Sequence, residues 1–157
     1  MRNGFRAWLL CSAVLLWSTL VPYTADAQSA LQDVHRFHKN GKHLFTLNYS
    51  EGIGAGFTYE GVGFTVYVSA LDSNMTVLYR CYRSSHHDHF ASTDANCEGF
   101  TNEGAYGYVS TVPRAGFTPL YRFFHPSLHD HLQTKNYAEV GGVGSWRFDF
   151  ILGYVPI

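Results

Sequence analysis

Short runs of β-branched and aromatic residues, separated by turn residues, recur along most of the chain. The runs VHRFHK, LYRCYR and LYRFFH end at Lys-Asn-Gly, Ser-Ser and His-Pro, which are turn signals. Further short runs, such as FTYEG and FTVYV, have the same character. No long segment repeats its apolar residues with the period of a helix. The pattern therefore predicts an all-β protein with short helical turns in its loops.

The same succession of runs occurs three times, which is the pattern of an internal repeat. The arginines of the three opening runs lie 44 and 42 residues apart, and a Thr-to-Glu segment follows each run: TLNYSE, TDANCE and TKNYAE. GFTYEG and GFTNEG match at five of six positions, and each repeat closes with Tyr-Val. We predict a short lead at 28–33 and a single domain over 34–157, with three units of about 43 residues at 34–69, 78–110 and 120–157.

Three units with roughly four short strands each favour a β-trefoil. In that fold, three copies close a small barrel around a pseudo-threefold axis, and no copy buries its apolar face alone. A three-bladed propeller-like arrangement is the alternative, although propellers typically have four or more blades.

The repeated motif LYRF…DHF.T…A…G…YEGV.F.V resembles the short-repeat secreted modules of the domain of unknown function DUF5648, over about residues 34–157. Modules of that family occur alone or attached to secreted hydrolases and peptidases, so the resemblance implies an accessory or binding module. The family offers no established catalytic residues to transfer. This chain departs from the motif at Lys42-His43 (usually Asp-His), at Cys81 (usually aromatic) and at the degenerate WRFDF.

The first 27 residues have the pattern of a secretory signal peptide. Arg2 and Arg6 precede the apolar run AWLLCSAVLLWSTLV, and Ala25-Asp26-Ala27 forms a small-x-small cleavage site. The run is short for a membrane span, and no second one follows. We expect a secreted, extracellular protein without a membrane span. Cleavage lowers Lys+Arg from 11 to 9 and Asp+Glu from 12 to 11, and this near-neutral balance predicts no nucleic-acid partner.

Two cysteines, Cys81 and Cys97, remain after the predicted cleavage. In an oxidising compartment we expect them to form a disulfide, which contributes about 3 kcal/mol by closing a loop of about 15 residues. Two buried free thiols are the alternative. Asn48 and Asn74 begin glycosylation sequons, and Asn74 is the better candidate because its surroundings are polar.

Histidines are crowded in SSHHDHFAST (84–93) and HPSLHDHLQT (125–134). They offer nitrogen ligands for Zn²⁺ or Cu²⁺, but one strand presents only two on the same face. The candidate metal ligands are His87, His89, His129 and His131. The favoured interpretation is structural: one histidine recurs per unit, and the aspartate before it suits an Asx-type turn. The recurrent histidines are His43, His89 and His131, and the surplus ones are His86, His87, His125 and His129.

Each unit has one recurrent arginine, which lies on the same face of its strand as an apolar residue. We therefore expect it to be partly buried, and a buried guanidinium needs a hydrogen-bond acceptor. Every unit carries an acid later in its sequence. We predict three scaffold pairs, with Asp88 and Asp130 as further acceptors: Arg36–Glu60, Arg80–Glu103 and Arg122–Asp149.

The chain has no GxSxG, HExxH or CxxC motif, so we expect neither catalytic residues nor a cofactor. Trefoils commonly bind sugars in shallow pockets where an aromatic ring stacks beside polar groups. By this analogy of fold, the candidate ligand-binding residues are Asn48, Tyr49, Asn96, Asn136 and Tyr137. The favoured function is a non-enzymatic, lectin-like module that binds carbohydrate. The alternatives are an extracellular structural or matrix protein, and a metal-dependent hydrolase that uses the clustered histidines.

Overall fold

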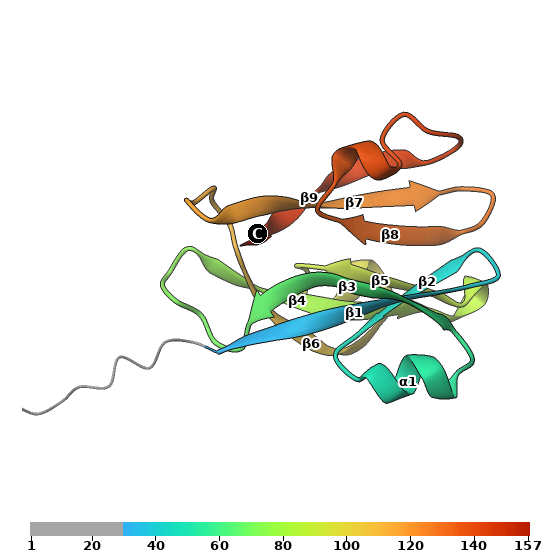
Figure 1. Cartoon of the computed structure of the whole chain (residues 1–157), viewed down its shortest axis with the longest axis horizontal. Coiled ribbons are helices and arrows are strands. Elements are labelled where there is room, and N and C mark those ends of the chain that lie inside the picture. Colours follow the sequence, from blue (N-terminus) through green and yellow to red (C-terminus); the bar gives the residue numbers. More distant parts are fainter. Residues whose placement is uncertain (1–29) are drawn as a thin grey trace, which may run out of the picture.

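The protein is mostly β-sheet in a computed structural model that describes residues 30–157 (Figure 1). The predicted signal peptide lies outside the described residues. Within them, no helix is long and apolar enough to cross a membrane.

Three consecutive parts of the chain, here called the first, second and third segments, have the same order of elements: long strand, short strand, helical turn, long strand. The first segment contains β1 (Leu31–Lys39), β2 (Lys42–Thr46), α1 (Tyr49–Gly54) and β3 (Thr58–Tyr67). The second contains β4 (Met75–Arg83), η1 (Ser84–His86), β5 (Asp88–Ser92), η2 (Cys97–Gly99) and β6 (Thr101–Ser110). The third contains β7 (Phe117–His125), β8 (Asp130–Thr134), η3 (Tyr137–Glu139) and β9 (Arg147–Pro156).

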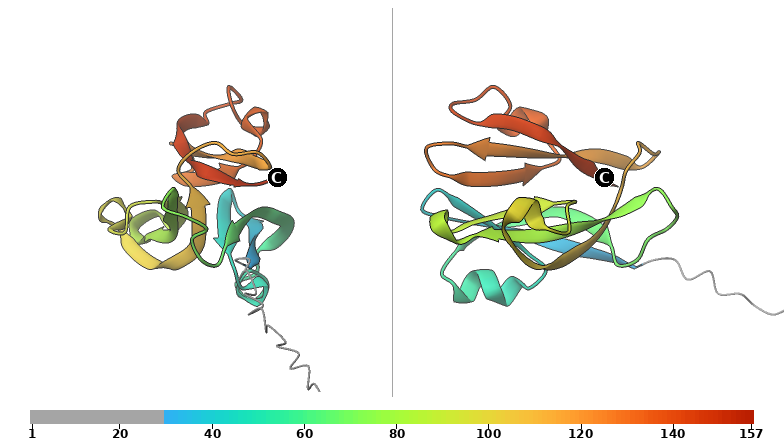
Figure 2. Two further views of the ribbon diagram at one scale, coloured as in Figure 1. Left: turned by 90° about the vertical axis from the view of Figure 1, so that its left-hand side faces the viewer. Right: turned by 180° about the vertical axis from the view of Figure 1, so that it is seen from behind.

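Each segment forms an antiparallel sheet in which the opening strand pairs with both others, in the orders β2-β1-β3, β5-β4-β6 and β8-β7-β9. Among the described residues, one pair joins β3 to β6 (Tyr67 and Tyr108) and one joins β6 to β9 (Ser110 and Tyr154). These single pairs join the nine strands into one sheet, whose three-stranded parts are here called the three sheets. Figure 2 shows them as three groups of strands around a common centre.

The predicted number of strands per unit is wrong. The structure has three strands per segment where about four were expected, because FTYEG and FTVYV both belong to the single strand β3. Register shifts in its pairing with β1 interrupt the alternation of side chains, so that one strand has the sequence pattern of two. Strand β1 also begins at Leu31, inside the predicted lead 28–33.

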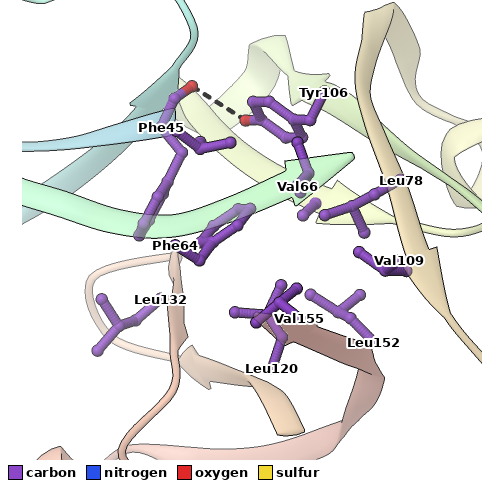
Figure 3. Packing of buried hydrophobic residues seen from close by; sticks show 12 residues of the cluster. Phe45, Phe64, Val66, Leu78, Tyr106, Val109, Leu120, Leu132, Leu152 and Val155 are labelled. Carbon is purple, nitrogen blue, oxygen red and sulfur yellow. Dashed lines mark hydrogen bonds between the residues drawn. The ribbon is translucent and has the colours of Figure 1, made fainter. Parts of the chain in front are cut away.

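One hydrophobic core lies between the three sheets, and each segment contributes four residues to it (Figure 3). Strands β3, β6 and β9 lie against one another, and so do β2, β5 and β8. The core residues are Val34, Phe45, Phe64 and Val66; Leu78, Ala91, Tyr106 and Val109; and Leu120, Leu132, Leu152 and Val155. The buried Tyr106 hydroxyl donates a hydrogen bond to the Phe45 carbonyl at 3.0 Å. The apolar faces of the three sheets are therefore buried by one another.

The closing strands approach closely where β3 meets β6. A Cβ atom on Gly107 would lie 2.5 Å from the Tyr67 carbonyl oxygen, and the φ angle of Gly107 is +143°. Only a residue without a side chain fits this place without moving the neighbouring backbone.

We expect Gly107→Ala to lower the free energy of unfolding by about 1–3 kcal/mol, because the added methyl group clashes with backbone. Urea denaturation of the purified domain measures this loss. Gly54→Ala in α1 is the control, since a Cβ there meets nothing within 4 Å, and we expect its stability to be unchanged or higher. Equal stabilities of the two variants would contradict the close approach of β3 and β6.

Candidate functional site

The recurrent arginine of each segment lies next to an acid of the same sheet. Register shifts place the acid opposite the arginine: Glu60 is the extra residue between the partners of Arg36 and Phe37, and Asp149 is its counterpart opposite Arg122. The structure brings all three predicted pairs to salt-bridge distance: Arg36–Glu60 at 2.9 Å, Arg80–Glu103 at 2.8 Å and Arg122–Asp149 at 3.0 Å.

A second carboxylate reaches each arginine from the helical turn of a neighbouring segment. The pairs are Glu51–Arg80 at 2.7 Å, Glu98–Arg122 at 2.6 Å and Glu139–Arg36 at 2.7 Å. Each of these glutamates also accepts a hydrogen bond from a hydroxyl group at the end of a short strand: Thr46, Ser92 and Thr134, respectively. The repeated Thr-to-Glu spacing signalled these residues, but sequence alone does not show which segment packs next to which.

The recurrent histidines form a second set of contacts across the junctions. The main-chain nitrogen of His131 donates to Asp88 at 3.0 Å, and its Nδ1 lies 2.8 Å from the same carboxylate. His43 makes the same two contacts with Asp130, at 2.9 and 2.6 Å. Both aspartates are fully buried. Their carboxylates therefore serve a neighbouring segment, and the expected Asx-type turn is wrong for them.

Asp88 and Asp130 are likewise not the further acceptors predicted for the three recurrent arginines. Asp88 pairs instead with Arg83, at 3.0 Å. In the described part of the chain, the contacts of the Asp130 carboxylate are those with His43.

Charge pairing lowers the pKa of several of these acids. Burial alone would raise the pKa of Asp88, but the hydrogen bonds from His131 and the charge of Arg83 outweigh it, and the pKa lies below its ordinary value. The same balance, with Arg122 as the partner, lowers the pKa of Glu98. Hydrogen bonds from Arg80 are the largest influence on Glu51 and lower its pKa as well.

A pocket of about 440 Å³ opens between the second and third segments. Arg122 with its two acids and His131 line the pocket, and Arg83 lies at its edge over two of the rings. Five aromatic rings form its walls: Phe90, Phe100, Phe124, Phe148 and Phe150. Three of them are 40–44 % exposed, namely Phe100, Phe148 and Phe150. The pocket therefore presents accessible ring faces beside fixed charges.

The predicted ligand-binding residues do not form one site. Tyr49 packs against Phe37 and Tyr137 against Phe123, each on its own segment. Asn48 and Asn136 accept hydrogen bonds from main-chain N–H groups of the following turns, so they are helix N-caps, and Asn96 lies before η2. Only Tyr137 is near the pocket, through its contact with Phe148 at 5.5 Å.

The predicted disulfide between Cys81 and Cys97 is confirmed, with its Cα atoms 5.5 Å apart. Both cysteines are buried next to Phe90. Cys81 takes the position held by Phe37 and Phe123 in the other segments, so a covalent link replaces the ring packing found there. The two sequon asparagines, Asn48 and Asn74, are exposed.

Each histidine proposed as a metal ligand contacts another side chain in the structure. Within residues 30–157, no group of three or more His, Cys, Asp or Glu residues is arranged to hold a metal ion. His87 Nδ1 lies 2.9 Å from the Tyr82 hydroxyl, and the His89 ring stacks on Tyr82. His129 packs against the ring of His86, and His131 contacts Asp88.

The fold and these junctions define an all-β protein whose charged and aromatic residues meet between three sheets. The chain belongs to the family described as Domain of unknown function (DUF5648), whose family model matches residues 18–98 and again residues 37–156. Comparisons with curated proteins and with solved structures gave no match.

We expect Arg122→Met to lower the free energy of unfolding by about 2–3 kcal/mol. This loss is smaller than the roughly 3–5 kcal/mol expected when a fully buried pair is broken, because the acids paired with Arg122 retain solvent contact. The variant leaves Glu98 and Asp149 without their shared cation. Chemical denaturation measures the loss. Arg114→Met is the control, because the partner Asp72 is 45 % exposed and water screens the pair, so its loss should be smaller. Similar losses in both variants would contradict a structural role for the buried network.

Acid should destabilise the fold through the same network. Asp88, Glu98 and Glu51 have lower pKa values folded than unfolded, so the unfolded state binds more protons in acid. Their stabilisation is complete above the ordinary carboxyl values of about 4 and is lost as the pH falls through the lowered values. We expect melting temperatures to fall below about pH 4.5.

Asp88→Asn removes one of these titrating groups, so its melting temperature should fall less between pH 7 and pH 2 than that of the unaltered protein. Thermal melts over this range test the expectation. An identical acid loss in both proteins would show that Asp88 does not contribute.

Proposed function

We propose that the protein is a secreted, non-enzymatic binding module that recognises carbohydrate in the pocket between its second and third segments. The observation that carries the proposal is the set of three exposed rings, Phe100, Phe148 and Phe150, beside the Arg122 network. The face of an aromatic ring carries partial negative charge and attracts the C–H groups of a sugar ring. Charged groups at the edge of such a platform are then available to the sugar hydroxyls.

The network makes this pocket polar and rigid at the same time. Arg122 is 4 % exposed and bonds to Glu98, Asp149 and the Ala91 carbonyl, while its guanidinium lies 4.2 Å from the centre of the Phe150 ring. In the described part of the chain, Asp149 uses Oδ2 for these contacts, which leaves Oδ1 able to accept from a ligand hydroxyl. Groups held in place before binding lose little conformational freedom on binding, and this favours affinity.

The threefold organisation is part of the same proposal. Three equivalent arginine clamps and three equal contributions to the core support the interpretation of the chain as three repeats. The three groups of strands are joined by single residue pairs, which supports the propeller-like alternative more than the closed barrel expected of a β-trefoil. Secretion is supported by the N-terminal sequence pattern and by the disulfide, which oxidising compartments favour. The partners of such a secreted module are glycans of the cell surface or extracellular matrix.

A glycan array with the folded mature chain, followed by calorimetry with the best glycan, tests the carbohydrate proposal. We expect saturable, selective binding that Phe100→Ala combined with Phe150→Ala weakens at least tenfold, about 1.4 kcal/mol. Tyr49→Ala is the control, because Tyr49 is an exposed aromatic residue on the first segment, and it should retain full affinity.

The other outcomes identify the alternatives. Loss of binding in Tyr49→Ala but not in the pocket variant would indicate that the sugar binds at the helical turns, where the sequence predicted the site. Absence of saturable selectivity would favour an extracellular structural or matrix protein. Metal near one equivalent per chain, in protein purified without a chelator or His-tag, would favour the histidine-dependent hydrolase.

A further inference from the structure

The histidine–aspartate contacts are present at two of the three junctions between segments. Asp88 of the second segment holds His131 of the third, and Asp130 of the third holds His43 of the first. At the junction of the first and second segments, the corresponding histidine is His89, but the residue in the aspartate position is Lys42. This junction therefore lacks the carboxylate that the other two supply from within the chain.

The side chain of Lys42 has different partners from those of the two aspartates. Its Nζ donates to the carbonyl oxygens of Leu128 and His129, at 2.5 and 2.8 Å, so it links the first segment to the third. His89 stacks on Tyr82 with ring centres 4.5 Å apart, and its Nε2 lies 3.4 Å from Glu103. Among the described residues, no side chain hydrogen-bonds to Nδ1 of His89, the atom that contacts aspartate in the sister histidines.

A pocket of about 440 Å³ lies at this place, and Lys42 and His89 both line it. Lys39, Phe57 and Tyr82 line it as well. They correspond in sequence to Arg83, Phe100 and Phe124 of the pocket between the second and third segments, where the Asp88 carboxylate reaches His131. The lining of the pocket contains two lysines and no acid, so it favours an anion.

We infer that this pocket binds a carboxylate-bearing small molecule, whose carboxylate takes the place of the missing aspartate at His89 and whose ring body lies on Tyr82 and Phe57. The pocket is larger than a carboxylate group alone requires and matches the size of a small-molecule site. Hydrogen bonds from cationic groups to a carboxylate are among the strongest available. The site is distinct from the proposed carbohydrate pocket, and the inference does not depend on that proposal.

Two substitutions of Lys42 separate the effect of the lost lysine from the effect of a carboxylate at His89. Lys42→Asp supplies the missing carboxylate from within the chain and so competes with a ligand for His89. Lys42→Met removes the same lysine contacts with Leu128 and His129 but supplies no carboxylate. The two variants therefore lose the same lysine contacts and differ in the carboxylate and its negative charge, and without ligand we expect Lys42→Asp to melt at a higher temperature than Lys42→Met.

Binding is measured by NMR titration of the folded mature chain with glucuronate, benzoate, acetate and inorganic phosphate, with glucose as the neutral control. We expect glucuronate or benzoate to shift the His89 and Tyr82 signals saturably, and glucose to leave them unchanged. Lys42→Met should retain binding, weakened about three- to tenfold by the loss of one cation, about 0.7–1.4 kcal/mol. Lys42→Asp should weaken binding by a further factor of ten or more.

The outcomes decide the inference and the source of the ligand. Preference for glucuronate indicates an acidic sugar, and preference for benzoate indicates an aromatic acid; both support a carboxylate site. Phosphate binding as tightly as the carboxylates, or affinity unchanged in Lys42→Asp, overturns it. Absence of a saturable shift of His89 with every carboxylate also overturns it, and this result needs no variant.

Discussion

The arginine held between an acid of its own segment and a glutamate of a neighbouring segment is the interaction on which the rest of this structure depends. In the described part of the chain, the sheets share only single residue pairs, Tyr67–Tyr108 and Ser110–Tyr154, so main-chain pairing does little to hold them together. The common core provides much of the attraction but no direction. The buried charges provide the direction, because a guanidinium without its acids is costly to bury.

The same geometry places functional chemistry at the junctions. Wherever two segments meet, an arginine clamp, a histidine and aromatic residues of the opening strand come together, and small sequence differences decide what the junction contains. Between the third and first segments, Trp146 lies against His43 and His125. Between the second and third, exposed phenylalanine rings line a pocket beside Arg122, and between the first and second, Lys42 replaces the acid. One scaffold thus carries three different environments.

Much of this arrangement was predictable where it depends on neighbours in the chain. Alternating runs and turn signals predicted strands, and two cysteines in an expected oxidising compartment predicted the disulfide between Cys81 and Cys97. The role of Glu51, Glu98 and Glu139 was missed, because each glutamate serves an arginine outside its own segment. The pocket was missed for the same reason, since its phenylalanines come from three strands and one loop of two segments.

The sequence by itself determined the all-β class, the disulfide and the recurring arginine and histidine positions, because these follow from local periodicity and from alignment of the chain with itself. The tertiary structure alone decided the partners of those residues. Which histidine each of Asp88 and Asp130 reaches depends on the order in which the sheets pack around their centre. That order is set by the charge pairs between segments, whose partners lie far apart in the chain and leave no local signal in the sequence.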